Sequence, residues 1–103
     1  MPRWITVAKV NELAPGQYKT LEIDGEPIAV FNIDGKFYAI QDVCTHDGGV
    51  LTGGTVEGSI ITCPRHGAQF DITTGAVLRM PAFEPLPTYE VRVEGDEVQI
   101  LFE

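Results

Sequence analysis

Two short segments of this sequence contain all of its cysteines and histidines. Cys44-Thr45-His46 supplies one of each, and Cys63-Pro64-Arg65-His66 supplies the other two. Thiolates and imidazoles are ligands that proteins use for zinc ions and for iron–sulfur clusters. We therefore expect both segments to contribute to one metal site.

The order of these ligands resembles the signature of Rieske proteins. A C-x-H segment is followed, after sixteen residues, by C-x-x-H. In Rieske proteins two histidines replace two cysteines on one iron of a 2Fe–2S cluster. The resemblance is to soluble Rieske-type ferredoxins and extends over the whole chain. It implies one [2Fe-2S] cluster per chain, with Cys44 and Cys63 on the inner iron and His46 and His66 on the outer iron.

Two other interpretations use the same residues. A structural zinc ion would accept two cysteines and two histidines, although zinc sites more often group like ligands in pairs. A Cys44–Cys63 disulfide would leave both histidines unexplained, and nothing else in the sequence indicates an oxidising compartment. The iron–sulfur interpretation is therefore preferred. A zinc-stabilised interaction module remains an alternative of another functional class.

Composition narrows the range of partners and locations. A chain of 103 residues has room for one domain. Seven basic and fifteen acidic residues give a net charge of −8, which argues against nucleic acid as a partner, since phosphate binding calls for a basic surface. The acidity fits either ordinary solubility or steering toward basic patches on redox partners. No apolar run is long enough for a signal peptide or a membrane span, so we expect a cytoplasmic protein.

Short alternating segments bounded by turn residues predict an all-β fold of about eight to ten strands. Alternation in the last third of the chain places Tyr89, Val91 and Val93 on one face of a strand. Asp34-Gly35 and Gly95-Asp96 are predicted hairpin turns. The predicted strands are Trp4–Val7, Gln17–Ile23, Ile28–Ile33, Lys36–Gln41, Ser59–Cys63, Ala76–Arg79, Tyr89–Glu94 and Glu97–Phe102.

The resemblance also implies a domain organisation. We expect a Rieske fold with an antiparallel β-sandwich or barrel-like base, formed by residues of about 1–41 and 84–103. A small cluster-binding lobe, about residues 42–80, would be inserted into this base. Five glycines lie between the two ligand pairs and would let backbone N–H groups approach the cluster sulfides. The segment Met80–Pro87 contains three prolines and resembles the loop that covers the cluster in Rieske proteins.

Four positions distinguish this chain from one branch of the family. High-potential Rieske proteins carry a disulfide between the two ligand loops, and the matching positions here are Gly49 and Arg65. They also carry a serine and a tyrosine whose hydroxyls donate to cluster sulfurs, and the matching positions here are Ala68 and Phe70. Missing donors leave the more negative reduced state less stabilised. The resemblance therefore implies a low-potential cluster.

The chain is similar in length and motif to the ferredoxin components of bacterial aromatic-ring-hydroxylating dioxygenase systems. This resemblance implies a soluble, monomeric one-electron carrier, not an enzyme. Its partners would be an NAD(P)H-dependent flavin-containing ferredoxin reductase and a terminal Rieske non-haem iron oxygenase. The chain is too short for a second, mononuclear iron domain, and it lacks a G-x-G-x-x-G nucleotide-binding motif. The alternative within the same class is the Rieske-like small subunit of an assimilatory nitrite reductase.

Overall fold

The computed structural model describes residues 2–45, 47–80 and 82–103 and confirms an all-β antiparallel fold. Every pairing between its named strands is antiparallel. Within the described ranges, no helix is long and apolar enough to span a membrane. In chain order the elements are β1 (Arg3–Lys9), the 3-10 helix η1 (Val10–Glu12), β2 (Tyr18–Ile23), β3 (Glu26–Ile33), β4 (Lys36–Gln41), β5 (Val56–Glu57), β6 (Ile60–Thr62), β7 (Gln69–Asp71), β8 (Val77–Arg79), β9 (Thr88–Tyr89), β10 (Val91–Glu94) and β11 (Glu97–Phe102).

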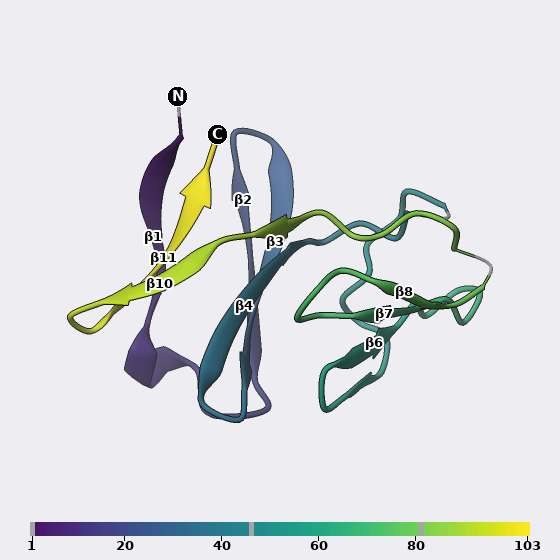
Figure 1. Cartoon of the computed structure of the whole chain (residues 1–103), viewed down its shortest axis with the longest axis horizontal. Coiled ribbons are helices and arrows are strands. Elements are labelled where there is room, and N and C mark those ends of the chain that lie inside the picture. Colours follow the sequence, from purple (N-terminus) through teal and green to yellow (C-terminus); the bar gives the residue numbers. More distant parts are fainter. Residues whose placement is uncertain (1, 46, 81) are drawn as a thin grey trace.

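The strands form three sheets. The first has the order β1-β11-β10, the second β2-β3-β4-β9, and the third β5-β6-β7-β8. The first sheet contains both terminal strands, β1 and β11, and the third sheet lies to one side of the first and second (Figure 1). All strands of the third sheet come from the chain between β4 and β9. The division into a base and an inserted lobe of residues 42–80 stays a prediction.

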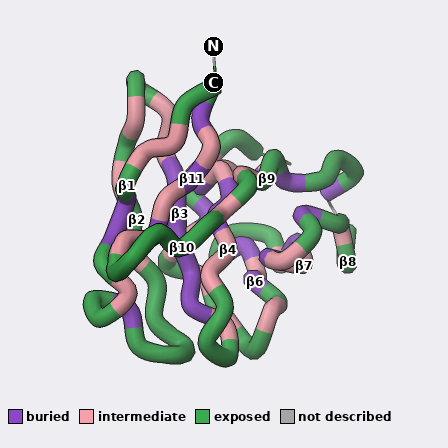
Figure 2. The backbone as a smooth tube through the Cα atoms, turned by 60° about the vertical axis from the view of Figure 1, so that its left-hand side comes forward, coloured by how far each residue is buried: buried purple, intermediate pink, exposed green. Residues whose placement is uncertain are grey.

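Strand β3 is the centre of the structure because both of its faces are buried. Ile28 and Val30 belong to an apolar cluster shared with the first sheet. Ala29 and Phe31 belong to a second cluster shared with the third sheet and the loops around it. Successive residues of a strand point to opposite faces, so the unbroken apolar run Ile28–Phe31 serves both clusters at once. Figure 2 shows the resulting buried stretch along β3.

Two hairpin turns of the second sheet follow directly from the sequence. Asp24-Gly25 joins β2 to β3, and Asp34-Gly35 joins β3 to β4. Asp24 and Asp34 have φ values of 51° and 53°, and the glycines that follow have 82° and 90°. Two successive residues with positive φ are typical of the tight hairpin turn that Asp-Gly favours. The turn predicted at Asp34-Gly35 is therefore confirmed.

The end of the chain differs from the prediction. The segment expected as one strand, Tyr89–Glu94, is divided at Glu90 into β9, which pairs with β4, and β10, which pairs with β11. The chain therefore passes from the second sheet to the first at this point. Val93, predicted to share one strand face with Tyr89 and Val91, is 49% exposed, because the β10–β11 hairpin extends beyond the second sheet (Figure 1). With this division and two short strands that were not predicted, β5 and β7, the described chain has eleven strands instead of eight to ten.

Gly54 lies where two segments of the third sheet region are too close for a side chain. A Cβ there would lie 1.8 Å from the carbonyl oxygen of Thr62 in β6. We expect Gly54→Ala to lower the midpoint of thermal unfolding by about 10 °C or more, since separating two backbone segments costs about 3 kcal/mol. Circular dichroism of the intact protein measures this midpoint.

Gly58 provides the control for this prediction. Its φ is +59°, and a Cβ there would meet nothing within 4 Å. Gly58→Ala should therefore show only the backbone cost of about 1 kcal/mol, which corresponds to about 5 °C. Equal midpoints for the two alanine variants would contradict the close approach at Gly54.

Candidate metal centre

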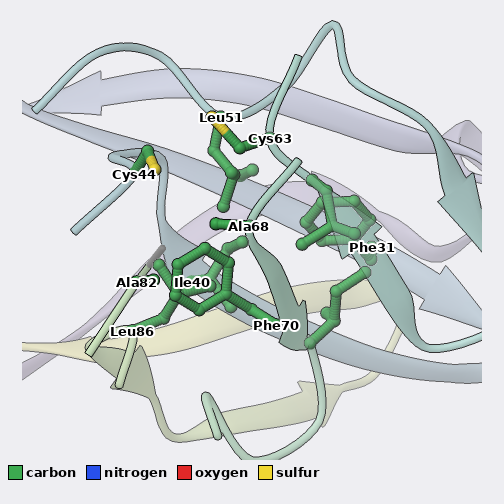
Figure 3. Close-up of a cluster of buried hydrophobic side chains, with 12 residues drawn as sticks. Phe31, Ile40, Cys44, Leu51, Cys63, Ala68, Phe70, Ala82 and Leu86 are labelled. Carbon is green, nitrogen blue, oxygen red and sulfur yellow. The ribbon is translucent and has the colours of Figure 1, made fainter. Parts of the chain in front are cut away.

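The structure brings the two cysteines together at the edge of an apolar cluster. Cys44 is fully buried and Cys63 is 2% exposed. Their Sγ atoms and a carboxylate oxygen of Asp47 all lie within 4.8 Å of one another. Figure 3 shows both sulfurs along one side of the buried side chains. No disulfide joins these two described cysteines.

Both cysteines begin loops with the same hydrogen-bond pattern. The Cys44 N–H donates to the Gly49 carbonyl at 2.8 Å, and the Cys63 N–H donates to the Ala68 carbonyl at 2.7 Å. In each loop the cysteine carbonyl also accepts from the N–H four residues later, at 2.8 Å from Gly48 and 3.2 Å from Gly67. These two loops, residues 44–49 and 63–68, are called the first and second ligand loops. Each holds its cysteine at the start of a closed turn.

Glycine occupies the same position in each turn. Gly48 has a φ of 75° and Gly67 a φ of 79°. This left-handed backbone favours glycine. The backbone of these turns therefore explains why glycine occurs at both positions. The sequence showed only that glycines gather near the ligand pairs.

The two histidines are placed less completely than the cysteines. His66 follows Cys63 in the second ligand loop, and its side chain is exposed. His46, the fourth predicted ligand, lies outside the described residues, as does Pro81 of the predicted covering segment. The structure therefore brings together two of the four predicted ligands and places His66 in the same loop as one of them.

A third segment packs against the cysteines. The Thr45 hydroxyl donates to the Glu84 carbonyl at 2.7 Å, which joins the first ligand loop to the proline-rich segment. Ala82 and Leu86 from that segment are buried in the cluster that includes both cysteines. These contacts support a covering role for the described part of Met80–Pro87.

Asp42 is a buried carboxylate that the sequence did not single out. It is 4% exposed and lies two residues before Cys44. Its carboxylate accepts from the Leu51 N–H at 3.1 Å, the Thr52 N–H at 2.8 Å and the Thr52 hydroxyl at 2.6 Å. It therefore joins the segments that precede and follow the first ligand loop. An acidic residue directly after an apolar strand was the available signal, but its burial is not visible in the sequence.

Asp47 is held by an arginine instead of being available as a ligand. Arg65 donates to both of its carboxylate oxygens, and the Gly49 N–H donates to one of them. The hydrogen bond from Arg65, followed by the one from Gly49, holds the pKa of Asp47 well below its usual range. Although one oxygen lies near the two sulfurs, the carboxylate charge is already paired. Thiols and imidazoles remain the donors for a metal centre.

This donor set fits a 2Fe–2S cluster with mixed ligands. Two buried thiols from two matching loops face one position, and each loop has a histidine two or three residues after its cysteine. Such a cluster takes two thiolates and two imidazoles. The apolar surroundings of the sulfurs would also limit solvent access to a bound group.

Comparison with known proteins identifies relatives over nearly the whole chain. The sequence model of the Rieske [2Fe-2S] domain matches residues 3–90. The biphenyl dioxygenase ferredoxin subunit of Pseudomonas sp. (strain KKS102) is 39% identical over 94 residues, which cover 90% of this chain and 86% of that protein. The ferredoxin component of the naphthalene 1,2-dioxygenase system of Pseudomonas aeruginosa is 33% identical over 98 residues, covering 95% of this chain and 94% of that protein.

Solved structures give the same result for the fold. A chain in the complex of reduced oxygenase and oxidized ferredoxin of carbazole 1,9a-dioxygenase superposes with a TM-score of 0.89 and 36% sequence identity. The match covers 94% of this chain and 91% of that chain. The predicted Rieske fold is therefore confirmed.

Proposed function

Because the chain belongs to the Rieske [2Fe-2S] domain family, we propose that it is the ferredoxin component of an aromatic-ring dioxygenase system and carries one electron at a time. The observation that carries this proposal is the meeting of two buried thiols from two matching loops. The family carries a 2Fe–2S cluster, and this chain holds one. When bound, the cluster supplies a one-electron couple. The zinc interpretation is not supported by these relatives.

We assign the cluster ligands within this proposal. Cys44 and Cys63 hold one iron as thiolates, while His46 and His66 each donate a ring nitrogen to the other. The buried side of the site is formed by the cysteines, and the exposure of His66 supports electron transfer through the histidine side. We also propose the division expected from the sequence, with a base of residues about 1–41 and 84–103 and a lobe of residues about 42–80.

The surface around the ligand loops supports transient docking there. Three large apolar side chains are exposed in or beside the ligand loops and the proline-rich segment: Val50 is 55% exposed, Met80 68% and Phe83 82%. Weak electron-transfer complexes use small interfaces, which such a surface can supply. We infer that a flavin-containing ferredoxin reductase and a terminal oxygenase dock here in turn, and that the ferredoxin dissociates between them. The monomeric state and the cytoplasmic location stay predictions.

Spectroscopy combined with an electron-transfer assay tests this function. The anaerobically purified chain should be red-brown, should bleach on reduction by one electron, and should show a Rieske-type EPR signal when reduced. It should also restore turnover when added to the reductase and oxygenase of a biphenyl dioxygenase system. A colourless, zinc-containing protein would refute the electron-carrier function. Activity only with a nitrite reductase large subunit would favour the alternative partner.

Charge reversal at the docking surface refines the assay. Glu84 is exposed in the proline-rich segment, so Glu84→Lys should slow reduction by the reductase several-fold at low ionic strength, and the effect should fade as salt is added. Glu22→Lys on β2 makes the same charge change at an exposed position of the second sheet and should have much less effect. Equal slowing by both variants would indicate a general effect of net charge instead of docking at the ligand loops.

A further inference from the structure

An ion pair joins the two ligand loops directly beside the cysteines. Arg65 lies between Cys63 and His66 in the second ligand loop, and Asp47 lies in the first. Arg65 Nε donates to Asp47 Oδ2 at 2.5 Å, and Arg65 Nη2 donates to Asp47 Oδ1 at 3.1 Å. The two parallel hydrogen bonds fix the orientation of both side chains. The pair therefore constrains one ligand loop relative to the other.

The remaining contacts extend this constraint along the first ligand loop. Arg65 Nη1 donates to the Val50 carbonyl at 2.9 Å, and the Gly49 N–H donates to Asp47 Oδ1 at 2.9 Å. The arginine therefore contacts the chain on both sides of Gly49. A Cβ at Gly49 would lie 2.7 Å from the Arg65 Cζ atom, so the guanidinium packs against bare backbone. A glycine at this position makes room for the arginine.

The other ion pairs of the described chain lack this geometry. Arg3 and Asp24 make one contact at 3.3 Å, with side chains 57% and 69% exposed. The side chains of Arg65 and Asp47 are 36% and 20% exposed. Exposed single contacts contribute little to stability. The Asp47–Arg65 pair therefore differs from an ordinary surface ion pair, because it is less exposed and has two parallel hydrogen bonds. Arg3–Asp24 consists of the same residue types and serves as a matched control.

The charges of the pair also act on the two sulfurs. The pKa of Arg65 is raised first by its hydrogen bond to Asp47, and the charges of Cys63 and Cys44 add to this rise. The guanidinium is thus within electrostatic range of both proposed thiolate ligands. Asp47, bound to the same guanidinium, supplies an opposite charge at nearly the same place. A neutral pair beside the sulfurs acts on them more weakly than either charge alone.

We propose that the Asp47–Arg65 pair positions the two ligand loops for the cluster and, as a charge-balanced unit, sets the reduction potential. This proposal rests on the proposed function, in which Cys44, His46, Cys63 and His66 hold the cluster. Its positioning part requires both side chains and their hydrogen bonds. Its electrostatic part requires only their charges. The two parts therefore predict different responses to substitution.

Neutralising each charge in turn tests the electrostatic part. Asp47→Asn leaves the Arg65 charge uncompensated, and a positive charge favours the more negative reduced state, so the potential should rise. Arg65→Gln leaves the Asp47 charge uncompensated, so the potential should fall. The double variant should return close to the wild-type value. Redox titration followed by visible circular dichroism and EPR measures all three.

Keeping the charge while removing the hydrogen-bond geometry tests the positioning part. Arg65→Lys retains the positive charge but cannot form two parallel hydrogen bonds to the carboxylate. Its potential should stay near that of the wild type, whereas the cluster should be lost several-fold faster in the presence of an iron chelator. Arg65→Gln should lose the cluster at a similarly increased rate. The double variant, Asp47→Asn with Arg65→Gln, should have a reduction potential close to that of the wild type. It should still lose its cluster faster than the wild type, because the hydrogen bonds are missing.

Controls separate this proposal from the function on which it rests. Arg3→Gln and Asp24→Asn remove the same charges from a pair on the first and second sheets and should change neither potential nor cluster loss. Shifts of the same sign in Asp47→Asn and Arg65→Gln, or no shifts, would overturn the electrostatic part. A shift in Arg65→Lys as large as that in Arg65→Gln would overturn it as well. Wild-type rates of cluster loss in every variant would overturn the positioning part. A wild-type chain without a cluster would instead refute the proposed function.

Discussion

Replacing Cys44 with serine, or His66 with alanine, will leave the chain without the Rieske-type EPR signal of the reduced protein. A serine oxygen is a poor substitute for a thiolate on iron, and alanine leaves an iron without one of its two imidazoles. Both variants should also lose most of the visible absorption and the iron that co-purifies with the wild type. The same result is expected for Cys63→Ser and His46→Ala.

The control for these four substitutions must lie in the same part of the fold without touching the site. Ser59→Ala lies in the turn before β6 and should keep the full cluster content. Iron analysis and EPR measure how much cluster each variant retains. Far-ultraviolet circular dichroism shows whether the sheets are intact, and the comparison distinguishes loss of a ligand from loss of the fold. A wild-type spectrum in any one of the four variants would remove that residue from the ligand set.

The sequence leaves one candidate set of ligands because so few residues are able to form it. With two cysteines and two histidines in the chain, spacing alone reduces the choice to one set. The structure supports the set by bringing the Cys44 and Cys63 sulfurs together from separate loops. The ligand roles of all four residues stay predictions, and His46 lies outside the described residues.

Interactions between the ligand loops could not be predicted in the same way. Asp47 and Arg65 are eighteen residues apart, and nothing in their spacing indicates that the loops face each other. Asp47 appears in the sequence as one of fifteen acidic residues, suitable for steering a partner, whereas its carboxylate is already bound to Arg65. A reversal of Asp47 would therefore disturb the ligand loops as well as the surface charge. Glu84 is the better position for a test of steering.

The fold shows a similar division between local and long-range information. Alternation along Glu97–Phe102 places Val98, Ile100 and Phe102 on one strand face, and all three are buried, because a strand covered on one face has a period of two. It does not show that the chain changes sheets at Glu90, since extended backbone has the same pattern whichever strand it pairs with. Strands of two or three residues, such as β5 and β9, are too short to show any period. Which strand pairs with which could therefore be determined only from the structure.

Ala68→Ser and Phe70→Tyr will raise the reduction potential of the cluster. Both native side chains are fully buried and belong to the cluster of apolar residues that includes Cys44 and Cys63. A buried hydroxyl must find a partner, and cluster sulfurs are the acceptors that the Rieske resemblance indicates. A hydrogen bond to a charged acceptor contributes about 1.5–3 kcal/mol, and 1.4 kcal/mol corresponds to about 59 mV for one electron. Each substitution should therefore raise the potential by at most about 130 mV. The limit applies if the hydrogen bond forms only in the reduced state, because a bond of equal strength in both redox states would not change the potential.

The direction follows from the charge of the reduced state. The added electron makes the sulfurs better acceptors, so a hydroxyl that reaches one stabilises the reduced form more than the oxidised form. With Ala68 and Phe70 in place, the native midpoint should lie near the low end of the Rieske range of about −150 to +300 mV. Protein-film voltammetry measures the native protein and both variants under the same conditions. A native midpoint above about +100 mV would contradict the low-potential assignment.

Matched substitutions in the other apolar cluster show whether proximity to the cysteines is the cause. Ala39→Ser and Phe37→Tyr add the same hydroxyls among residues shared by the first and second sheets. Ala39→Ser should lower stability, as a new buried polar group does, whereas Phe37→Tyr should lower it less because Phe37 is only partly buried. Both should leave the potential unchanged. If these variants shift the potential as much as Ala68→Ser and Phe70→Tyr do, the shift arises from a general loosening of the fold. If only Ala68→Ser and Phe70→Tyr shift it, the added hydroxyls act through hydrogen bonds to the cluster sulfurs, and the lack of such donors contributes to the low native potential.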